Sequence, residues 1–266
     1  MLIIKVGGGE KINWDYIAED LKTLVGREKV ILVHGGSVRR DKIAKMLKQG
    51  TRYITSPSGF VGAFTDQKAI EVLTMVYSGL INKEIVAKLQ KHGINAVGLT
   101  GADGRIWLGK RKPNILSFEQ GKTKLIQNMF TGKVEQVNTN LIRLLVENDY
   151  LPVITQPAIS YEGELINTDN DRNIAVMARD LKVKKMLVLF EAPGLLKDLT
   201  DETSLIKIVK KDQLEAVAKY AQGRMRKKVL GAKEAILAGV EKIYWGDGRI
   251  KNPLVQALGG KGTQII

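Results

Sequence analysis

The chain has 266 residues, of which 44% are hydrophobic and 26% are charged. This composition is ordinary for a globular protein, and the length can bury a large core. The sequence contains no cysteine, which excludes disulfides and thiolate metal sites. It has no apolar run near the ~20 residues that span a bilayer and no signal-peptide pattern after Met1, so we expect an intracellular, cytoplasmic protein with no membrane partner.

The formal net charge of +14 is the most unusual total. Such a charge can reflect nucleic acid, an anionic small substrate or an acidic protein partner. Aromatic residues make up only 6% of the chain, which argues against a stacking platform for single-stranded nucleic acid. We therefore expect no nucleic-acid partner. A lysine-rich surface typical of thermophilic proteins is an alternative explanation of the charge.

Short apolar runs alternate with longer amphipathic runs along the chain. The apolar runs predict buried strands at 2–6, 29–34, 94–99, 151–155, 185–190 and 242–245. The amphipathic runs predict helices at 14–25, 39–48, 66–91, 139–148, 169–181, 211–221 and 227–238. Such alternation indicates parallel βαβ units with helices on both faces of a sheet. Glycine and proline punctuate residues 103–133, which predicts β-hairpins there. We expect one domain, 1–266, built as a three-layer αβα sandwich on a mainly parallel sheet.

Two glycine loops follow the first two predicted strands. Gly7–Gly9 come directly after the strand that carries Lys5, and Gly35–Gly36 follow the second strand. Glycines at the carboxyl ends of parallel strands let backbone amides approach an anion closely. Either loop alone could be a simple tight turn, but the pair with a lysine beside it favours phosphate binding. The sequence has neither a P-loop nor a dinucleotide-binding pattern, so another phosphate cradle is needed.

Charged residues open two later helices. Asn167 and Asp171 lie four residues apart in a run of five polar residues, 167–171. Helix capping is the simplest role of such a run, but five residues exceed what a cap requires, and these two can flank one helix end as an amide donor and a carboxylate. The basic segment 224–228, which ends at Lys228, begins another helix, where positive charge opposes the helix dipole and suggests a nearby anion. A solvated basic face is the alternative for Arg226 and Lys227.

The reactive side chains suit one kind of chemistry. The chain has two histidines and no Ser-His-Asp or metal-ligand spacing, so general-base catalysis by histidine is poorly supported. Phosphorylation of a carboxylate needs no base, because the nucleophile is already ionised near pH 7. That reaction needs alignment, Mg²⁺ and positive charge around the phosphoryl group. Two lysines, glycine amides and one organising aspartate can supply the protein's part.

These motifs, in this order and over the whole chain, resemble the amino acid kinase family and, within it, the acetylglutamate kinase group. The resemblance implies ATP and Mg²⁺, no metal-binding protein side chains and a homodimer. It implies that Lys5 and Lys228 contact the transferred phosphoryl group and that Asp171 organises both lysines. It implies an acceptor-binding half, about 1–160, and a nucleotide-binding half, about 161–266. The residues expected to bind the acceptor are Gly35, Gly36, Asn167 and Arg52. The residues expected to bind phosphate and nucleotide are Gly7, Gly8, Glu191, Gly194, Leu195, Met225, Tyr244 and Gly246.

A finer resemblance lies in segments 75–83, 101–112 and 221–225, which are similar to the 2-aminoadipate kinases of lysine biosynthesis. The substrate of that group is tethered to a small acidic amino-group carrier protein of the LysW type. The resemblance therefore implies a carrier partner, which would account for the positive charge. It leaves carrier-linked glutamate open as a further acceptor. The expected docking surface comprises Arg39, Arg40, Arg105, Lys110, Arg111 and Lys112.

Two positions depart from the family pattern. An arginine that grips the substrate α-carboxylate in the family aligns with Ala63, and Arg52, Arg39 or Lys68 could replace it. The nucleotide-side pattern T-D-V-P-G is replaced by segment 190–194, which reads F-E-A-P-G. Two other functions stay open: a kinase acting on free N-acetylglutamate, and a non-catalytic nucleotide or metabolite sensor with the same fold.

Overall fold

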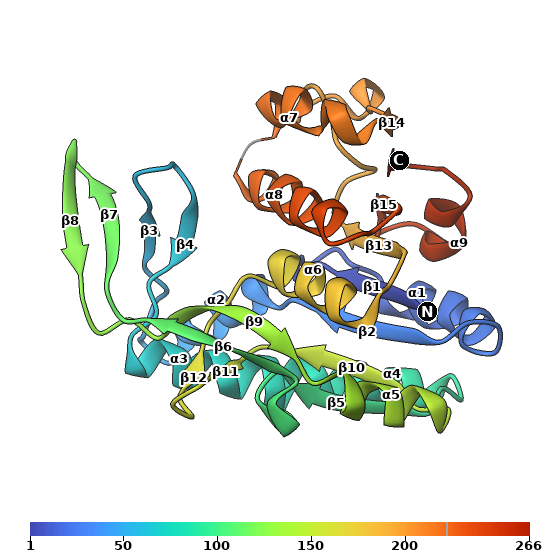
Figure 1. Cartoon of the computed structure of the whole chain (residues 1–266), viewed down its shortest axis with the longest axis horizontal. Coiled ribbons are helices and arrows are strands. Elements are labelled where there is room, and N and C mark those ends of the chain that lie inside the picture. The colour runs from blue at the N-terminus through green and yellow to red at the C-terminus, as the bar shows by residue number, and fades with distance from the viewer. Residues whose placement is uncertain (222) are drawn as a thin grey trace.

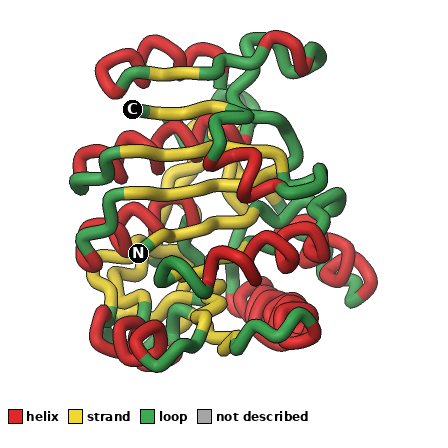
Figure 2. Tube along the Cα trace, turned by 90° about the vertical axis from the view of Figure 1, so that its right-hand side faces the viewer, coloured by secondary structure: helices red, strands yellow, loops and turns green. Residues whose placement is uncertain are grey.

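An eight-stranded sheet runs through the molecule in a computed structural model that describes residues 1–221 and 223–266 (Figures 1 and 2). Its strand order is β14-β16-β15-β13-β1-β2-β10-β5. Neighbouring strands pair in parallel, except that β16 is antiparallel to β15. The strands are β1 (Leu2–Val6), β2 (Val30–His34), β5 (Ala96–Thr100), β10 (Leu151–Thr155), β13 (Lys185–Phe190), β14 (Ile208–Val209), β15 (Lys242–Asp247) and β16 (Thr263–Ile265).

Helices cover both faces of this sheet (Figure 2). Both faces are apolar, because successive residues of β1 point to opposite sides of the sheet. Ile4 packs into a buried hydrophobic cluster on one side, and Ile3 packs into a second cluster on the other. The cluster around Ile4 receives α1 (Trp14–Val25), α2 (Ser37–Met46), α4 (Asn82–Lys91) and α9 (Pro253–Leu258). The cluster around Ile3 receives α5 (Thr139–Glu147), α6 (Asn170–Leu181) and α8 (Arg224–Leu237). The expected three-layer αβα architecture is confirmed.

Hairpins decorate one end of the sandwich, as expected for residues 103–133 (Figure 1). A four-stranded sheet joins β6 (Trp107–Lys112), β9 (Thr131–Val137), β11 (Ala158–Ser160) and β12 (Leu165–Ile166). Two hairpins project beside each other: β3 (Tyr53–Thr55) with β4 (Val61–Ala63), and β7 (Ile115–Glu119) with β8 (Lys122–Ile126). Short 3₁₀ turns occur at Asp103–Arg105 and Glu202–Ser204.

Two predicted helices differ in the structure. The helix expected at 66–91 is α3 (Gln67–Thr74), then a π-helical segment at Met75–Ile81, then α4. The single helix expected at 211–221 is instead divided: α7 (Leu214–Val217) is flanked by 3₁₀ turns at Lys211–Gln213 and Ala218–Tyr220. None of these three pieces has a side-chain cap, and Leu214 is the one residue buried within them, so little holds a longer helix.

Candidate active site

The carboxyl ends of β1 and β2 press the two glycine loops together. A Cβ atom on Gly8 would lie 2.6 Å from the amide nitrogen of Ser37, and one on Gly35 would lie 2.9 Å from that of Gly8. The Gly8 carbonyl also accepts a hydrogen bond from the Val38 amide, 3.3 Å away. Only glycine permits this approach. The structure thus brings Gly7, Gly8, Gly35 and Gly36 together at the edge where a phosphate site was predicted.

Lys5, Asp171 and Lys228 meet beside these loops, although they come from β1, α6 and α8. Lys5 Nζ lies 2.9 Å from Asp171 Oδ1, and Lys228 Nζ lies 3.3 Å from Asp171 Oδ2. The exposed fractions of the three side chains are 6%, 12% and 12%. We name this the lysine–aspartate cluster. The predicted catalytic residues are therefore in mutual contact.

Helix capping in α6 explains why Asp171 is free to bind lysines. The capping role belongs to Asp169, whose carboxylate accepts from the amides of Asp171 and Arg172. The approach of α8 depends on Gly231, because a Cβ atom there would lie 2.6 Å from the Asp171 carbonyl oxygen. Gly231 was not among the predicted site residues. Its signal in the sequence is a glycine inside a helix, which is costly unless close packing requires it.

Charge in the cluster is unbalanced. Burial alone would raise the pKa of Asp171, but Lys228 and Lys5 hold that pKa well below its usual range, so the carboxylate is ionised. Burial, together with the positive charge of Lys5, lowers the pKa of Lys228 to about 8 against the attraction of Asp171. For Lys5, burial is outweighed by the attraction of Asp171, which raises its pKa. Two lysines on one carboxylate leave a positive excess, which suits an anion.

The predicted acceptor residues separate into two places. The Asn167 side-chain amide donates to Thr65 Oγ1 at 2.9 Å, and its backbone is tied to Phe130 and Gly132. Arg52, which is 53% exposed, pairs instead with Glu119 of β7 at 2.7 Å. Within the described residues, none of its hydrogen bonds or ion pairs reaches the lysine–aspartate cluster.

The predicted nucleotide residues also differ in their surroundings. Glu191 folds under the first glycine loop, where its carboxylate accepts from the Lys11 amide. Gly194 is pressed against Thr263, and a Cβ atom on it would lie 2.9 Å from the Thr263 amide nitrogen. Met225 is half-buried at the start of α8. The remaining three residues are buried, so contact with a nucleotide would fall mainly to their backbone atoms: Leu195, Tyr244 and Gly246.

The π-helical segment supports the second glycine loop from behind. A Cβ atom on Gly36 would collide with Ile81 and lie 3.4 Å from Tyr77. Asn82, which follows the segment, donates to the Val153 carbonyl at 2.9 Å and lies 3.1 Å from His34 Nε2. Burial lowers the pKa of His34 to about 4, so its ring is neutral near pH 7. Hydrophobic periodicity does not reveal a π-helix, and these supporting residues were not predicted.

Residues 1–244 match the model of the amino acid kinase family. The chain belongs to this family. It is 46% identical over 266 residues to a [LysW]-aminoadipate kinase of Deinococcus radiodurans, covering 100% of this chain and 91% of that protein. It is 43% identical over 268 residues to a [LysW]-aminoadipate kinase of Thermus thermophilus, covering 100% of both.

The fold of this amino acid kinase family member is shared by solved structures. One is N-acetylglutamate synthase from Neisseria gonorrhoeae, complexed with coenzyme A and N-acetyl-glutamate, with a TM-score of 0.80 at 19% sequence identity. The match covers 99% of this chain but spans 58% of the length of the synthase. At this identity the similarity concerns the fold alone.

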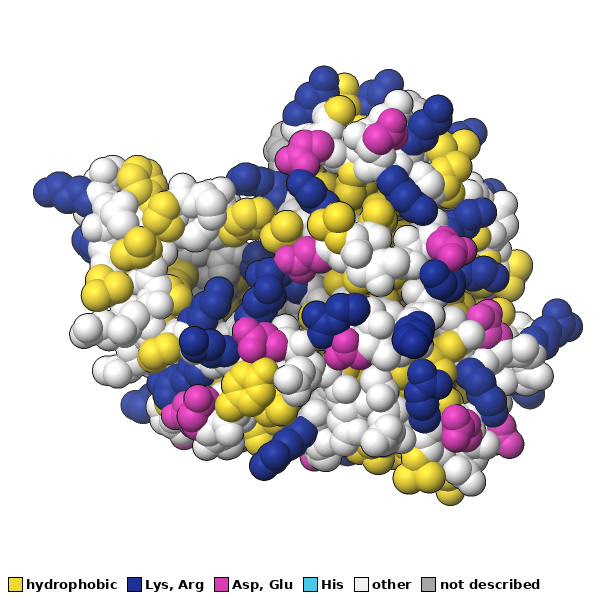
Figure 3. Space-filling view, in the orientation of Figure 1, with side chains coloured by type: hydrophobic (Ala, Val, Ile, Leu, Met, Phe, Trp, Pro, Cys, Tyr) yellow, Lys and Arg dark blue, Asp and Glu magenta, His cyan; other side chains and the backbone are white. Residues whose placement is uncertain are grey.

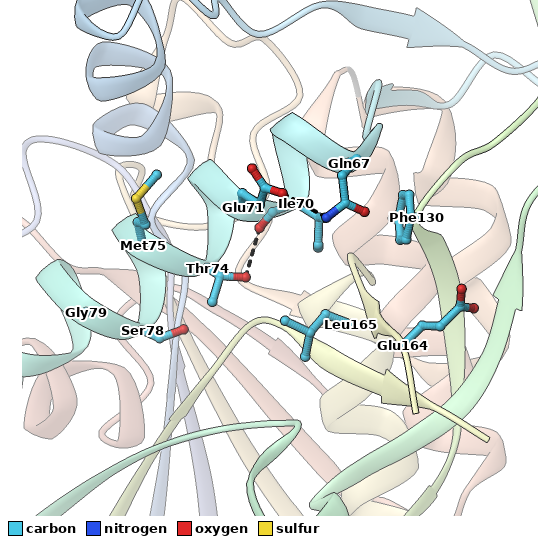
Figure 4. Close-up of a pocket in the computed structure, with 10 residues that line it drawn as sticks. All are labelled: Gln67, Ile70, Glu71, Thr74, Met75, Ser78, Gly79, Phe130, Glu164 and Leu165. Atoms are coloured by element: carbon cyan, nitrogen blue, oxygen red, sulfur yellow. Dashed lines mark hydrogen bonds between the residues drawn. The ribbon is translucent and has the colours of Figure 1, made fainter. Parts of the chain in front are cut away.

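Two cavities flank α3 in this family member. The larger, about 980 Å³, is an open apolar groove that contains none of the predicted site residues (Figure 4). Its lining includes Ile70, Met75, Phe130 and Leu165. The smaller, about 370 Å³, lies between α2, the base of the β3–β4 hairpin and α3. It is lined by charged residues that include Arg40, Arg52 and Lys68, and we name it the basic pocket.

Basic side chains gather around the hollow between the projecting hairpins and the body of the molecule (Figure 3). Of the six residues expected on a docking surface, two are engaged with other side chains of the chain itself. Arg40 is 7% exposed and paired with Asp41. Arg111 pairs with Glu164 and stacks 3.9 Å over the Phe130 ring. The other four are exposed: Arg39, Arg105, Lys110 and Lys112.

Within 1–221 and 223–266, no group of three or more His, Cys, Asp or Glu side chains could hold a metal ion. In that part of the chain, no helix has the length and apolar character needed to cross a membrane.

Proposed function

We propose that this protein transfers the γ-phosphoryl group of ATP to the side-chain carboxylate of 2-aminoadipate whose amino group is attached to a small acidic carrier protein. The observation that carries the proposal is the lysine–aspartate cluster beside two opposed glycine loops. The similarity to two [LysW]-aminoadipate kinases over the full chain supports the choice of acceptor. Carrier-linked glutamate is the second acceptor to test.

The reaction joins an acceptor oxygen to the γ-phosphorus while the bond from that phosphorus to the β–γ bridging oxygen breaks, and ADP leaves. The acceptor carboxylate is already ionised, so no general base is required. Lys5 and Lys228 offset the charge that spreads over the moving phosphoryl group. Asp171 holds both lysines in place, and the amides of Gly8 and Gly36 donate to phosphoryl oxygens. Alignment of acceptor and ATP supplies much of the remaining rate enhancement.

The chain fits a Mg²⁺ ion that arrives with the nucleotide rather than one held by the protein. Asp171, the carboxylate of the cluster, is already bound by two lysines. A magnesium ion coordinated mainly by ATP phosphates and water needs few protein carboxylates, and it would supply further neutralising charge. Apart from Gly7 and Gly8, the residues that would hold the nucleotide lie in the half of the chain from about 161 to 266. Apart from Asn167, the residues that would hold the acceptor lie in the half from about 1 to 160.

The carrier partner follows from charge. A net charge of +14 and the exposed residues Arg39, Arg105, Lys110 and Lys112 would attract an acidic protein. We place the protein in the cytoplasm with the rest of amino-acid biosynthesis.

We also infer a homodimer, and we assign its interface to the apolar groove beside α3, where Met75 is 55% exposed. Light scattering of the wild type and of Met75→Glu tests this, because a dimer through this groove should weaken in the variant.

The test of function is trapping of the acyl phosphate with hydroxylamine in the presence of ATP and Mg²⁺. Three acceptors are compared: carrier-linked 2-aminoadipate, carrier-linked glutamate and free N-acetylglutamate. Product with the carrier-linked acceptors alone supports the proposal. Product with free N-acetylglutamate would instead make this protein an acetylglutamate kinase. Binding of ATP without product from any acceptor would favour a non-catalytic sensor.

A further inference from the structure

The proposed acceptor has a second carboxylate that the reaction does not consume. When 2-aminoadipate is linked to a carrier through its amino group, its α-carboxylate stays free and ionised near pH 7. Removing such a group from water is costly unless cations and hydrogen-bond donors replace the water. An acceptor held tightly enough for alignment therefore needs a cationic site near the acceptor loop.

The basic pocket has the charge for this role. Its lining carries four cations against one carboxylate, that of Asp66: Arg40, Lys48, Arg52 and Lys68. Asp66 is partly used, because it caps α3 by accepting from the Ala69 amide at 2.9 Å. The pocket also shares a wall with the predicted acceptor site, since Thr65 lines the pocket and accepts a hydrogen bond from Asn167.

Arg40 is the best-positioned of the four cations. It is 7% exposed and follows the acceptor loop by one helical turn, with its amide donating to the Gly36 carbonyl at 2.9 Å. Its guanidinium is fixed: Nε and Nη2 lie 3.0 and 2.7 Å from Asp41 Oδ1, and Nη2 lies 3.0 Å from the Tyr53 hydroxyl. No hydrogen bond found among the described residues uses Nη1. A planar guanidinium held in this way is preorganised to bind a carboxylate.

The hairpin leaves room over this guanidinium. Tyr53 and Ala63 are directly paired across β3 and β4, so their side chains point to the same face. Tyr53 reaches Arg40 on that face, and the methyl group of Ala63 fills little of the space beside it. Arg52 is less available, because Glu119 already pairs with it. Lys68 is exposed and unpaired in the ion pairs of the described residues, so it can add attraction without fixing geometry.

We propose that Arg40 binds the free α-carboxylate of the acceptor in the basic pocket, which makes it a specificity-determining residue and not part of the docking surface. This inference rests on the proposed function. Asp41 stays as the second partner of Arg40: burial raises its pKa, but Tyr53 and Arg40 outweigh this and hold it below its usual value. The guanidinium would thus bridge one protein carboxylate and one acceptor carboxylate.

The experiment compares carrier-linked 2-aminoadipate with the same acceptor bearing an α-carboxamide. Wild type should prefer the carboxylate by about 10- to 100-fold in kcat/KM, as expected for a hydrogen-bonded charge. Arg40→Met should lose most of this preference through a raised acceptor KM, with the KM for ATP unchanged. Lys45→Met, an exposed position on the same helix, should keep it. If Arg40→Met folds poorly, the double variant Arg40→Met/Asp41→Asn removes both charges of the pair.

Each outcome decides the inference. Equal use of the two acceptors by wild type, with turnover observed, overturns the role of Arg40 and leaves the proposed function standing. An unchanged preference in a folded Arg40 variant overturns it as well. Absence of wild-type turnover with both acceptors removes the proposed function and the inference together. The comparison of acceptors on wild type needs no variant, so a failure to fold cannot hide a negative result.

Discussion

Gly231 of α8 lies against the backbone of Asp171 in α6, and a Cβ atom at Gly231 would approach the Asp171 carbonyl oxygen to 2.6 Å. This contact sets the distance between the two helices. Lys228 lies one turn before Gly231 on the same helix, so the same contact brings its ammonium group to 3.3 Å from Asp171 Oδ2. A residue with no side chain thus positions Lys228, to which we assign a role in catalysis.

Gly231→Ala tests this directly. The added methyl group must push α8 away from α6, because its neighbours are the carbonyl group and the Cβ atom of Asp171, which cannot rotate aside. We expect a loss of stability of about 1–3 kcal/mol, typical of overpacking, and a lower kcat at temperatures where the variant is folded. Gly26→Ala is the matched control, since nothing lies within 4 Å of a Cβ atom there and its φ is −72°. Equal melting temperatures and equal kcat for both variants would contradict this account.

Removing either lysine of the cluster should affect chemistry far more than folding. Lys5→Ala and Lys228→Ala each remove positive charge from the developing phosphoryl group, and we expect kcat to fall about 10²- to 10³-fold. Circular dichroism should show a folded protein in both cases, because one lysine still pairs with Asp171. Lys227→Ala is the control, since that neighbouring lysine lies 3.6 Å from the capping residue Asp169 instead. Near-normal kcat in a lysine variant would remove that lysine from the mechanism.

Activity should depend on the charge of Lys228 at alkaline pH. Its pKa is about 8 in the folded protein, so we expect kcat/KM to decrease as pH rises above 8. Lys228→Arg keeps a permanent positive charge and should abolish this decrease, whatever its absolute activity. A decrease of the same shape in the arginine variant would assign the titration to another group.

Stability should respond to the same lysine with the opposite trend. The folded-state pKa of about 8 lies below the value of about 10.4 expected in the unfolded chain. Between these two values the unfolded state binds more protons, so this lysine makes the free energy of unfolding rise with pH. Denaturant titrations of wild type and Lys228→Met at pH 8 and pH 10 measure the difference. If the contribution of Lys228 to the free energy of unfolding decreases between pH 8 and pH 10, the lowered pKa of this lysine is contradicted.

The elements that could be predicted from sequence are those whose pattern is local. β1, β10 and β13 have the predicted bounds, because a fully buried parallel strand is a nearly continuous apolar run, which in β1 only Lys5 interrupts. β14 and β16 were not predicted, since two or three residues are too few to show alternation. Their pairing at the sheet edge depends on partners far away in the sequence.

The lysine–aspartate cluster could be predicted only from the order of the motifs. Lys5, Asp171 and Lys228 are each ordinary for their local sequence, and only the fold shows that they touch. Arg40 shows what the sequence pattern alone cannot reveal. It lies between Arg39 and Asp41 in a polar stretch that looks like a solvated helix face. It is nevertheless buried, and it donates to the hydroxyl group of Tyr53 from the hairpin, a contact that helical periodicity does not reveal.

Exposed charge on the β6 region should govern carrier association and not chemistry. Arg105→Glu/Lys110→Glu reverses two exposed charges, and we expect the KM for carrier-linked acceptors to rise about tenfold, or ~1.4 kcal/mol, at low salt. The increase should shrink as salt screens the interaction, while kcat at saturating acceptor stays near the wild-type value. Lys22→Glu reverses one exposed charge on α1, outside the β6 region, and is the control for net charge. If Lys22→Glu raises the KM per charge as much as the double variant does, the carrier responds to total charge and has no docking site at β6.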